Sequence, residues 1–257
     1  MNIIIPMSGL GSRFAAAGYK DIKPLIKIHG KPIIEWVVRM FDPKDKFIFI
    51  CRDAHLNTIK EMRETLEKIA PNAEIIAIEG EKKGPVWAVS QIFHKIDDNS
   101  PAIVSYCDYF QVWNCQSFYQ WTADTNCDGS VVCYQGFHPH LIPLQNVYAS
   151  CLCEGNKILE IREKFSFTEN KSLTPQSSGM YYFKKGAYIK KYFQQLINEN
   201  INLNGEYYVS LVYNLMIRDK LDIRVYHDVP YFCQWDTPED LADYLRWAEI
   251  FSGEDNG

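Results

Sequence analysis

The sequence predicts an α/β fold built on a mixed, mainly parallel sheet. Up to about residue 128, short β-rich runs alternate with segments of helical periodicity, a rhythm typical of parallel strands joined by right-handed crossovers. After that point the strand-like runs follow one another before helical patterns return, so we expect a more antiparallel second half. Because no linker, repeat or low-complexity tract interrupts the 257 residues, we expect one domain, 1–257, with halves at about 1–128 and 129–250.

The first-half strands are short runs rich in isoleucine, valine or phenylalanine, and the helices have apolar residues three and four positions apart. The expected strands are Asn2–Met7, Lys46–Cys51, Glu74–Ile78 and Ala102–Ser105. The expected helices are Pro32–Phe41, Leu56–Ile69, Pro85–His94 and Val112–Trp121. Pro32 suits a first helical turn, and Pro71 stops the helix that precedes it.

In the second half, the expected strands follow one another without helices between them, at 129–136, 146–153, 157–161 and 179–183. Helical patterns return at 186–199, 206–219 and 237–251. The last helix has a start signal, because Thr237 can cap it, Pro238 suits its first position and Asp240 lies three residues after the cap.

Composition and charge argue against several classes of protein. The chain is 47% hydrophobic but has no run of about 18 apolar residues, which argues against a transmembrane helix. The net charge of −5 argues against a nucleic-acid or anionic-membrane partner, because both reward a basic surface. The amino terminus lacks the basic region of a signal peptide, and the eight cysteines are scattered without a CxxC pair. We therefore expect free thiols and a cytoplasmic protein.

The charge is unevenly distributed along the chain. Residues 13–31 carry a net charge of +4, with Asp21 as their single acidic residue, in a chain whose total is −5. The basic side chains of this segment are Arg13, Lys20, Lys23, Lys27 and Lys31. A basic segment beside a glycine-containing loop in an acidic protein predicts a small anionic ligand.

That loop, Ser8–Ser12, directly follows the first expected strand and contains Gly9 and Gly11. In open α/β sheets ligands bind beyond the carboxyl ends of strands, and glycines let backbone N–H groups approach a phosphate. A dinucleotide fingerprint is incomplete because Phe14 stands where its third glycine would be. No Gly-Lys-Ser/Thr follows, as a nucleoside-triphosphatase loop would require. By itself, the loop is either a phosphate cradle or a tight turn.

Three neighbouring segments carry a more specific signal: Gly9-Leu10-Gly11-Ser12-Arg13, Lys23-Pro24-Leu25 and Gly30-Lys31-Pro32. Together they resemble the sugar-phosphate nucleotidylyltransferases, which join a nucleoside triphosphate to a sugar 1-phosphate and release pyrophosphate. The resemblance implies a Rossmann-like, three-layer nucleotidyltransferase fold with a nucleotide-binding first half and an acceptor-binding second half. It implies catalytic roles for Arg13 and Lys23, and nucleotide binding by Ser8, Gly9, Leu10, Gly11 and Ser12.

Two aspartates resemble the family's metal ligands. Asp108 follows the fourth expected strand, and Asp236 directly precedes the Thr237 cap of the last expected helix. Two hard carboxylates, with phosphate oxygens and water completing the shell, suit Mg²⁺, the cofactor that the resemblance implies. The alternative for each is a surface aspartate without a ligand.

The acceptor-binding residues are implied by looser motifs. Glu163-Lys164 resembles the family's Glu-Lys-Pro, whose lysine contacts the acceptor phosphate, although Phe165 replaces the proline. Gly179 precedes an aromatic run that resembles the strand meeting the sugar, and Glu206 lies where the family often has an acidic residue. An exposed lysine and a packed aromatic strand are the alternatives. The implied acceptor is a sugar 1-phosphate, with a phosphorylated polyol or choline as variants.

The loop from Glu79 to Pro85 lies where relatives recognise the nucleobase, which assigns nucleotide binding to Glu79, Gly84 and Pro85. An ionised Glu79 only accepts hydrogen bonds, so it favours the amino groups of cytosine or guanine over O4 of uracil or thymine. We therefore expect CTP or GTP rather than UTP or dTTP, unless Glu79 is an exposed loop residue. Ser8, which stands where the family usually has Ala or Gly, could offer its hydroxyl or amide to the base or ribose.

The resemblance thus predicts a Mg²⁺-dependent cytidylyltransferase or guanylyltransferase, and short bacterial members commonly act in capsule or lipopolysaccharide assembly. Two alternatives remain. A nucleotide-sugar-dependent glycosyltransferase shares a similar α/β half, but it usually holds its metal with Asp-x-Asp, whereas Tyr109-Phe110 follow Asp108. A non-catalytic nucleotide-binding paralogue tends to lose a catalytic lysine or a metal aspartate. The sequence identifies no self-complementary surface, so it predicts no oligomeric state.

Overall fold

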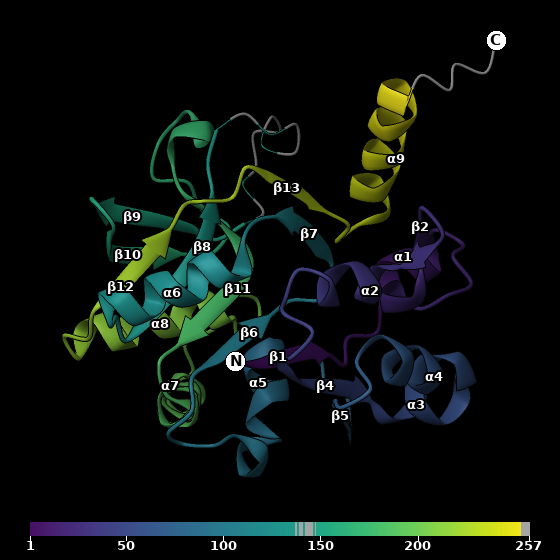
Figure 1. The fold of residues 1–257 in the computed structure, drawn as a ribbon, viewed down its shortest axis with the longest axis horizontal. Helices are drawn as coiled ribbons and strands as arrows, with labels where there is room; N and C mark the ends of the chain where they lie inside the picture. Colours follow the sequence, from purple (N-terminus) through teal and green to yellow (C-terminus); the bar gives the residue numbers. More distant parts are fainter. Residues whose placement is uncertain (137, 139–140, 142–145, 147, 253–257) are drawn as a thin grey trace.

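The central sheet passes through both halves of the chain. A computed structural model describes every residue except 137, 139–140, 142–145, 147 and 253–257. In the described part of the chain the sheet has nine strands: β1 (Asn2–Met7), β4 (Lys46–Arg52), β5 (Glu74–Ile78), β6 (Ala102–Ser105), β8 (Gly129–Tyr134), β9 (Ser150–Glu154), β10 (Lys157–Arg162), β11 (Gln176–Phe183) and β12 (Ile223–Tyr226). Within the described residues their order is β5-β4-β1-β6-β11-β8-β12-β10-β9 (Figure 1).

Strand direction changes near the middle of the sheet. β1 pairs in parallel with β4 and β6, and β4 with β5, so the first-half strands all point the same way. β11 runs antiparallel to β6 and β8, and β10 runs antiparallel to β12 and β9. Since β8 and β12 are parallel to each other, only β10 and β11 oppose the common direction among the described strands of this sheet. The expectation of a mixed, mainly parallel sheet is confirmed.

Helices cover both faces of the sheet, because successive strand residues point to opposite sides. Ile4 and Val104 belong to the core shared with α5 (Pro85–Ser90), α7 (Gly186–Asn198) and α8 (Val209–Arg218). Their neighbours Ile3 and Ile103 belong to the core shared with α2 (Ile33–Val38), α4 (Lys60–Ile69) and α6 (Cys115–Thr125). The expected α/β three-layer arrangement is confirmed (Figure 1).

Besides the helix expected at Pro32–Phe41, which spans only Ile33–Val38, two expected helices differ from what their apolar periodicity indicates. The helix expected at Leu56–Ile69 is divided into α3 (Asp53–Thr58) and α4, because Ile59 between them has an extended backbone with φ −115° and ψ 95°. The helix expected at Pro85–His94 ends at Ser90, and a single 3₁₀ turn at Phe93–Lys95 follows it.

A third expected helix, Val112–Trp121, begins too early in the sequence-based prediction. The segment Tyr109–Val112 is instead a strand, β7, that pairs antiparallel with β13 (Tyr231–Gln234). Helix α6 begins only after Asn114, whose side chain caps it by accepting a hydrogen bond from the Ser117 N–H at 3.0 Å. This stretch is a strand because it pairs with a distant segment, and local periodicity carries no information about that pairing.

Several smaller differences concern element ends and short elements. Helix α8 starts at Val209 rather than at residue 206, and β9 starts at Ser150, while residue 147 of the expected strand 146–153 lies outside the described residues. The sequence-based prediction did not include the strands β12 and β13, the short helix α1 (Ser12–Ala16), or the two-residue strands β2 (Lys27–Ile28) and β3 (Lys31–Pro32).

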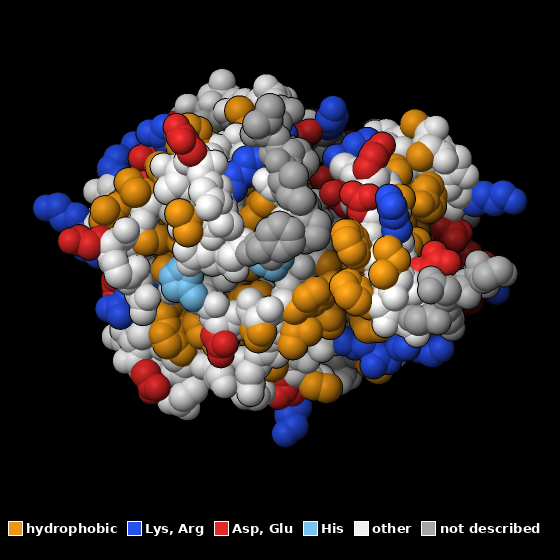
Figure 2. Space-filling model, turned by 90° about the horizontal axis from the view of Figure 1, so that it is seen from above, with side chains coloured by type: hydrophobic (Ala, Val, Ile, Leu, Met, Phe, Trp, Pro, Cys, Tyr) orange, Lys and Arg blue, Asp and Glu red, His pale blue; other side chains and the backbone are white. Residues whose placement is uncertain are grey.

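The last helix, α9 (Pro238–Ser252), packs beside the glycine-loop region. Phe14, Trp235 and Leu241 share a small apolar cluster that joins α1, the residue after β13, and α9. Large apolar side chains remain exposed on β7, β13 and α9, and Figure 2, which views this side, shows hydrophobic side chains gathered there. They are Val112, Tyr231, Leu245, Trp247, Ile250 and Phe251. None of these six lines the cavity described below.

No helix among the described residues is long and apolar enough to span a membrane. All eight cysteines are free thiols, as the sequence predicted.

Candidate active site

A cavity of about 620 Å³ lies beyond the carboxyl ends of the first-half strands. Its walls include the loop after β1, Arg52 at the end of β4, the loop between β5 and α5, and Asp108 after β6. The second half contributes Glu163, Lys164, Gly179, Glu206 and Asp236. The cavity is large enough for a small-molecule ligand, and it collects most of the site residues that the sequence predicted.

The loop after β1 forms one wall of this cavity. Ser8 is buried there, whereas Gly9 and Leu10 are exposed, and all of Ser8–Arg13 line the cavity. Gly11 has a left-handed backbone with φ +64° and precedes the first turn of α1, a conformation that glycine adopts without steric cost. The sequence-predicted loop residues are therefore on the cavity surface.

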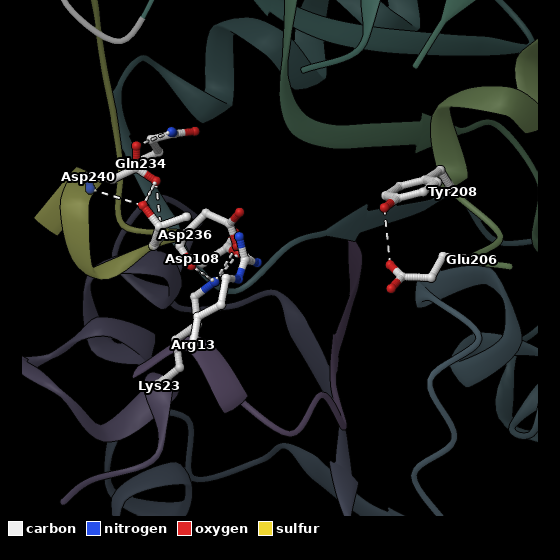
Figure 3. A network of polar contacts seen from close by, with 9 residues as sticks. Arg13, Lys23, Asp108, Glu206, Tyr208, Gln234, Asp236 and Asp240 are labelled. Atoms are coloured by element: carbon white, nitrogen blue, oxygen red, sulfur yellow. Dashed lines mark hydrogen bonds and ion pairs between the residues drawn. The ribbon is translucent and has the colours of Figure 1, made fainter. Parts of the chain in front are cut away.

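Lys23 is the centre of a charged cluster (Figure 3). Its Nζ donates hydrogen bonds to Asp108 Oδ2 at 2.7 Å, to Asp236 Oδ1 at 2.6 Å and to the Asp236 backbone carbonyl at 2.9 Å. Arg13 Nη2 donates to the same Asp236 Oδ1 at 2.9 Å. Two cations and two carboxylates that are far apart in the sequence therefore share one contact network.

Lys23 and Arg13 differ in their access to solvent. The Lys23 side chain is 13% exposed, whereas that of Arg13 is 59% exposed. Burial opposes the charged form of Lys23, but the carboxylates of Asp108 and Asp236 outweigh it and raise the pKa of Lys23. Lys23 is thus a buried, paired cation at neutral pH, and Arg13 is a more exposed one at the edge of the network.

The carboxylate of Asp236 is held ionised by its neighbours. Burial opposes its charge, but Lys23 and Arg13 lower the pKa of Asp236 to about 2. For Asp108, burial dominates the attraction of Lys23 and raises the pKa of its carboxyl. The two aspartates share one ammonium group, so the cluster is arranged to hold positive charge between two carboxylates.

The main chain brings the two aspartates together. Asp108 follows β6, Asp236 follows β13, and the Trp235 N–H donates to the Asp108 carbonyl at 2.7 Å. Beyond Asp236, Thr237 and Asp240 form a reciprocal cap on α9: the Asp240 N–H donates to Thr237 Oγ1 at 3.0 Å, and the Thr237 N–H donates to Asp240 Oδ2 at 2.9 Å. The predicted cap is confirmed, and it fixes the residue next to Asp236.

The donor set of Asp108 and Asp236 fits a divalent metal of the magnesium type. Their oxygens already surround one cation, the Lys23 ammonium. The described residues contain no cluster of three or more His, Cys, Asp or Glu that could bind a metal by themselves. Mg²⁺ commonly uses one or two carboxylates, with substrate phosphates and waters as the other ligands, so two aspartates suffice.

On the opposite wall, the predicted acceptor-side residues have neutral partners. Ser210 Oγ donates to Glu163 Oε2 at 2.5 Å, and Tyr208 donates to Glu206 Oε2 at 3.1 Å (Figure 3). Lys164 Nζ lies 5.6 Å from the ring centroid of Tyr208, a cation–π contact. Burial raises the pKa of Glu163 to about 7, against the opposing effects of Ser210 and Lys164. This carboxyl therefore titrates near neutral pH.

Gly179 brings the aromatic strand β11 close to Tyr106. Its backbone is left-handed at φ +93°, and a Cβ at this position would approach the Tyr106 ring at 3.2 Å. The Tyr106 N–H donates to the Gly179 carbonyl at 2.9 Å. Ser178 Oγ and the Tyr106 hydroxyl are buried without a hydrogen-bond partner among the described residues, and both residues line the cavity. They offer unused polar groups to a ligand.

The loop after β5 is joined to the opposite half of the site. Gly84 has φ +84°, and a Cβ there would lie 2.8 Å from the Tyr207 backbone. Two backbone hydrogen bonds, from Tyr207 to Lys83 at 2.9 Å and from Val86 to Tyr207 at 3.1 Å, link the two segments. Gly84 and Pro85 line the cavity as predicted. The positions of the loop after β5 and the segment around Tyr207 are therefore coupled.

Glu79 is the one predicted site residue that does not line the main cavity. It is exposed and lines a shallow side pocket together with Arg52, Asp53, Ala54 and Gly80. Arg52, which lines both pockets, was absent from the sequence-predicted site. The available signal was its place at the carboxyl end of an expected strand, the same kind of position that identified Asp108.

Comparison with known proteins agrees with this geometry. Residues 3–164, more than half of the chain, match the family described as the MobA-like NTP transferase domain. None of the curated proteins matches the chain.

Solved structures share the fold at low sequence identity. The nucleoside-diphosphate-sugar pyrophosphorylase from Vibrio cholerae RC9 is similar over 95% of this chain and 99% of its own, with a TM-score of 0.75 and 21% identity. A putative glucose-1-phosphate thymidylyltransferase from Bacillus anthracis is similar over 96% and 95%, with a TM-score of 0.71 and 16% identity. The inositol-1-phosphate CTP transferase from T. maritima is similar over 98% and 96%, with a TM-score of 0.71 and 13% identity. These similarities establish the fold.

Proposed function

Because the chain belongs to the MobA-like NTP transferase domain family, we propose that it transfers a nucleoside monophosphate from a nucleoside triphosphate to a sugar 1-phosphate or phosphorylated polyol. The observation that carries this proposal is the cluster of Arg13, Lys23, Asp108 and Asp236 in a cavity that both halves of the chain enclose. A triphosphate and a second phosphate together bring several negative charges. The two cations of this cluster can neutralise part of that charge, and its two carboxylates can hold a metal ion that neutralises more.

The proposed reaction is a direct displacement at the α-phosphorus. A phosphate oxygen of the acceptor forms a bond to that phosphorus, the bond to the α–β bridging oxygen breaks, and pyrophosphate leaves with the electron pair. Such a transfer needs positioning and charge neutralisation more than acid–base chemistry. The buried Lys23 suits the charge that develops at the α-phosphate, since a fixed cation needs no reorganisation during the reaction. The more exposed Arg13 suits the leaving pyrophosphate.

Asp108 and Asp236 would hold Mg²⁺, which supplies Lewis-acid and template chemistry to the phosphates when it is bound. Lys23 donates to both of these carboxylates. We infer that the two aspartates keep Lys23 oriented toward the cavity, and that Lys23 then exchanges part of this contact for phosphate oxygens.

On the acceptor wall, Lys164 would hold the attacking phosphate, because it is an exposed cation of the cavity lining. Glu163, Glu206, and the unused polar groups of Tyr106 and Ser178 would meet hydroxyl groups of the acceptor. A polyhydroxylated acceptor fits such a wall. The product would then be an activated unit of the kind that surface-polysaccharide synthesis consumes.

CTP or GTP remains the proposed donor, but Glu79 does not support this preference, because it is exposed and does not line the main cavity. The eight free thiols are compatible with the proposed cytoplasmic location.

The proposal is tested by measuring pyrophosphate release with CTP, GTP, UTP and dTTP against a panel of phosphorylated sugars and polyols. We expect release that depends on both substrates and is abolished by a metal chelator. Release of a nucleoside diphosphate from a nucleotide sugar would instead support the glycosyltransferase alternative. Nucleotide binding without turnover of any pair would support the non-catalytic alternative.

A further inference from the structure

Arg52 occupies a position between the two loops of the nucleotide-side wall. It is the last residue of β4, where Cys51 pairs with Met7 of β1 and Arg52 pairs with Ile78 of β5. The loops that follow β1 and β5 therefore flank its side chain. Arg52 lines the main cavity together with Ser8, Gly84 and Pro85.

The guanidinium group of Arg52 is fixed from two sides. Its Nε donates to the Ser8 backbone carbonyl at 3.0 Å. On the other side it packs so closely on Gly80 that a Cβ at this position would lie 2.3 Å from Cζ and 2.4 Å from Nη2. A side chain at position 80 would displace the guanidinium from this place. The arrangement holds the group in place rather than leaving it to solvent.

Arg52 also lacks a direct ion-pair partner in the described part of the chain, although Asp53 and Glu79 line the side pocket with it. Among the described residues, no carboxylate lies within ion-pair distance of it, whereas Arg13, Arg39 and Arg218 each pair with an acidic side chain. Its Nη1 and Nη2 groups have no hydrogen-bond partner in the described part of the chain. A fixed guanidinium with unused donors at a ligand cavity is suited to bind a ligand acceptor.

We propose that Arg52 is a specificity-determining residue that reads the nucleobase of the donor nucleotide. This inference rests on the proposed function. The phosphates belong with the Lys23 cluster, so the base lies toward the loops after β1 and β5, where Arg52 stands. A guanidinium only donates hydrogen bonds and fits two adjacent acceptors. Cytosine presents O2 and N3, and guanine presents O6 and N7, as such a pair.

Uracil and thymine present the opposite pattern, because the N3–H donor stands between their two carbonyl groups. Adenine offers N7 beside an amino group, so a donor faces the guanidinium there as well. Arg52 thus selects cytosine or guanine over the other bases through its own chemistry. The selection does not depend on Glu79, which lies in the side pocket.

The test compares the four triphosphates in three variants. Arg52→Met removes all donors, Arg52→Lys keeps the charge without the planar fork, and Gly80→Ala keeps Arg52 but displaces its guanidinium. For each we expect kcat/KM with the preferred triphosphate, CTP or GTP, to fall about 10- to 100-fold, mainly through KM, while UTP turnover and the acceptor KM change little. Comparison of CTP with GTP identifies which base is read.

Arg246→Met is the matched control, because Arg246 is exposed on α9 and does not line the cavity. Binding of free cytidine and guanosine, measured by calorimetry, separates base reading from phosphate binding and also tests Arg52 if no triphosphate is turned over. Weaker nucleoside binding in all three variants supports the proposal. Equal losses for every triphosphate, or unchanged nucleoside binding in folded variants, would overturn it. Absence of turnover in the unaltered protein would count against the proposed function, not against Arg52.

Discussion

The two facing walls of the cavity hold their charged groups in different ways. On the nucleotide-side wall, Lys23 makes three short contacts to Asp108 and Asp236, and Arg13 adds a fourth. On the acceptor-side wall, Glu163 and Glu206 have hydroxyl partners, and Lys164 has an aromatic ring. Figure 3 shows Glu206 and Tyr208 apart from the Lys23 cluster across the site.

This difference indicates which charged groups are already held in place before a substrate binds. Opposite charges in contact fix one another, and this suits a step common to all nucleotidyl transfers, the stabilisation of phosphate charge. Neutral partners leave a carboxylate free to exchange its contact for a substrate hydroxyl. The nucleotide-side wall is therefore suited to the reaction, and the acceptor-side wall to the identity of the substrate.

The largest expected effect comes from the centre of the preorganised wall. Lys23→Ala removes the cation shared by both aspartates, so we expect kcat to fall by a factor on the order of 10² to 10³. Steady-state kinetics and circular dichroism measure activity and folding together. Lys27→Ala is the matched control, because this neighbouring lysine is exposed and does not line the cavity. Near-normal turnover in folded Lys23→Ala would remove Lys23 from the mechanism.

Substitution on the acceptor-side wall is expected to act on binding of one substrate. Lys164→Ala removes the exposed cation that would hold the acceptor phosphate, so the acceptor KM should rise about 10-fold or more while the KM of the triphosphate stays constant. Initial rates at varied concentrations of each substrate measure this split. Lys157→Ala is the control, because Lys157 is exposed on β10 and does not line the cavity. An equal rise in both KM values would contradict the division between the walls.

Titration of Glu163, on the acceptor-side wall, makes the stability of the protein depend on pH. Its pKa is raised by burial to about 7 from the ordinary value of 4.5, so the folded state binds more protons than the unfolded state between these pH values. Its contribution to the free energy of unfolding is therefore greatest at low pH and is lost as pH rises toward 7. We expect Glu163→Gln to weaken the decline of the melting temperature from pH 5 to pH 8.

Calorimetry of the two proteins across this range checks the prediction. Glu160→Gln is the control, since Glu160 pairs with Arg162 on the exposed side of β10. An unchanged pH profile in Glu163→Gln would show that burial does not raise the pKa of this carboxyl.

The smallest effect is expected at the cap beside Asp236. Thr237→Ala removes the hydroxyl that accepts from the Asp240 N–H, and loss of such a cap costs about 1 kcal/mol. In a chain of this size that corresponds to a fall of roughly 2–4 °C in melting temperature. Thr237→Ser keeps the hydroxyl and should retain most of the stability. If both variants melt alike, the cap does not stabilise α9 through its hydroxyl.

The two walls also differ in how far the sequence predicted them. Arg13, Lys23, Asp108 and Asp236 lie in short motifs at the ends of expected strands and helices, and the structure brings all four together. Arg52 has no motif around it. Its importance comes from Ser8 and Gly80, which approach it only when β1, β4 and β5 pair.

The same reasoning explains the elements that were misplaced. Ile59 interrupts an otherwise continuous apolar pattern, and only its extended backbone reveals the division between α3 and α4. Strand β7 depends on β13, more than a hundred residues later in the chain. Local periodicity predicts helices and strands whose formation depends on nearby residues. It does not predict an element, such as β7, that forms only by pairing with a distant segment.

The central claim is that the Lys23 wall supports transfer at the α-phosphorus. The most direct measurement follows a triphosphate labelled at its α-phosphate during reaction with an acceptor phosphate. The account predicts that the label enters a new diphosphate-linked product, that unlabelled pyrophosphate appears in equal amount, and that Lys23→Ala slows both equally. Label recovered as free nucleoside diphosphate or monophosphate, with no product containing the acceptor, would contradict it.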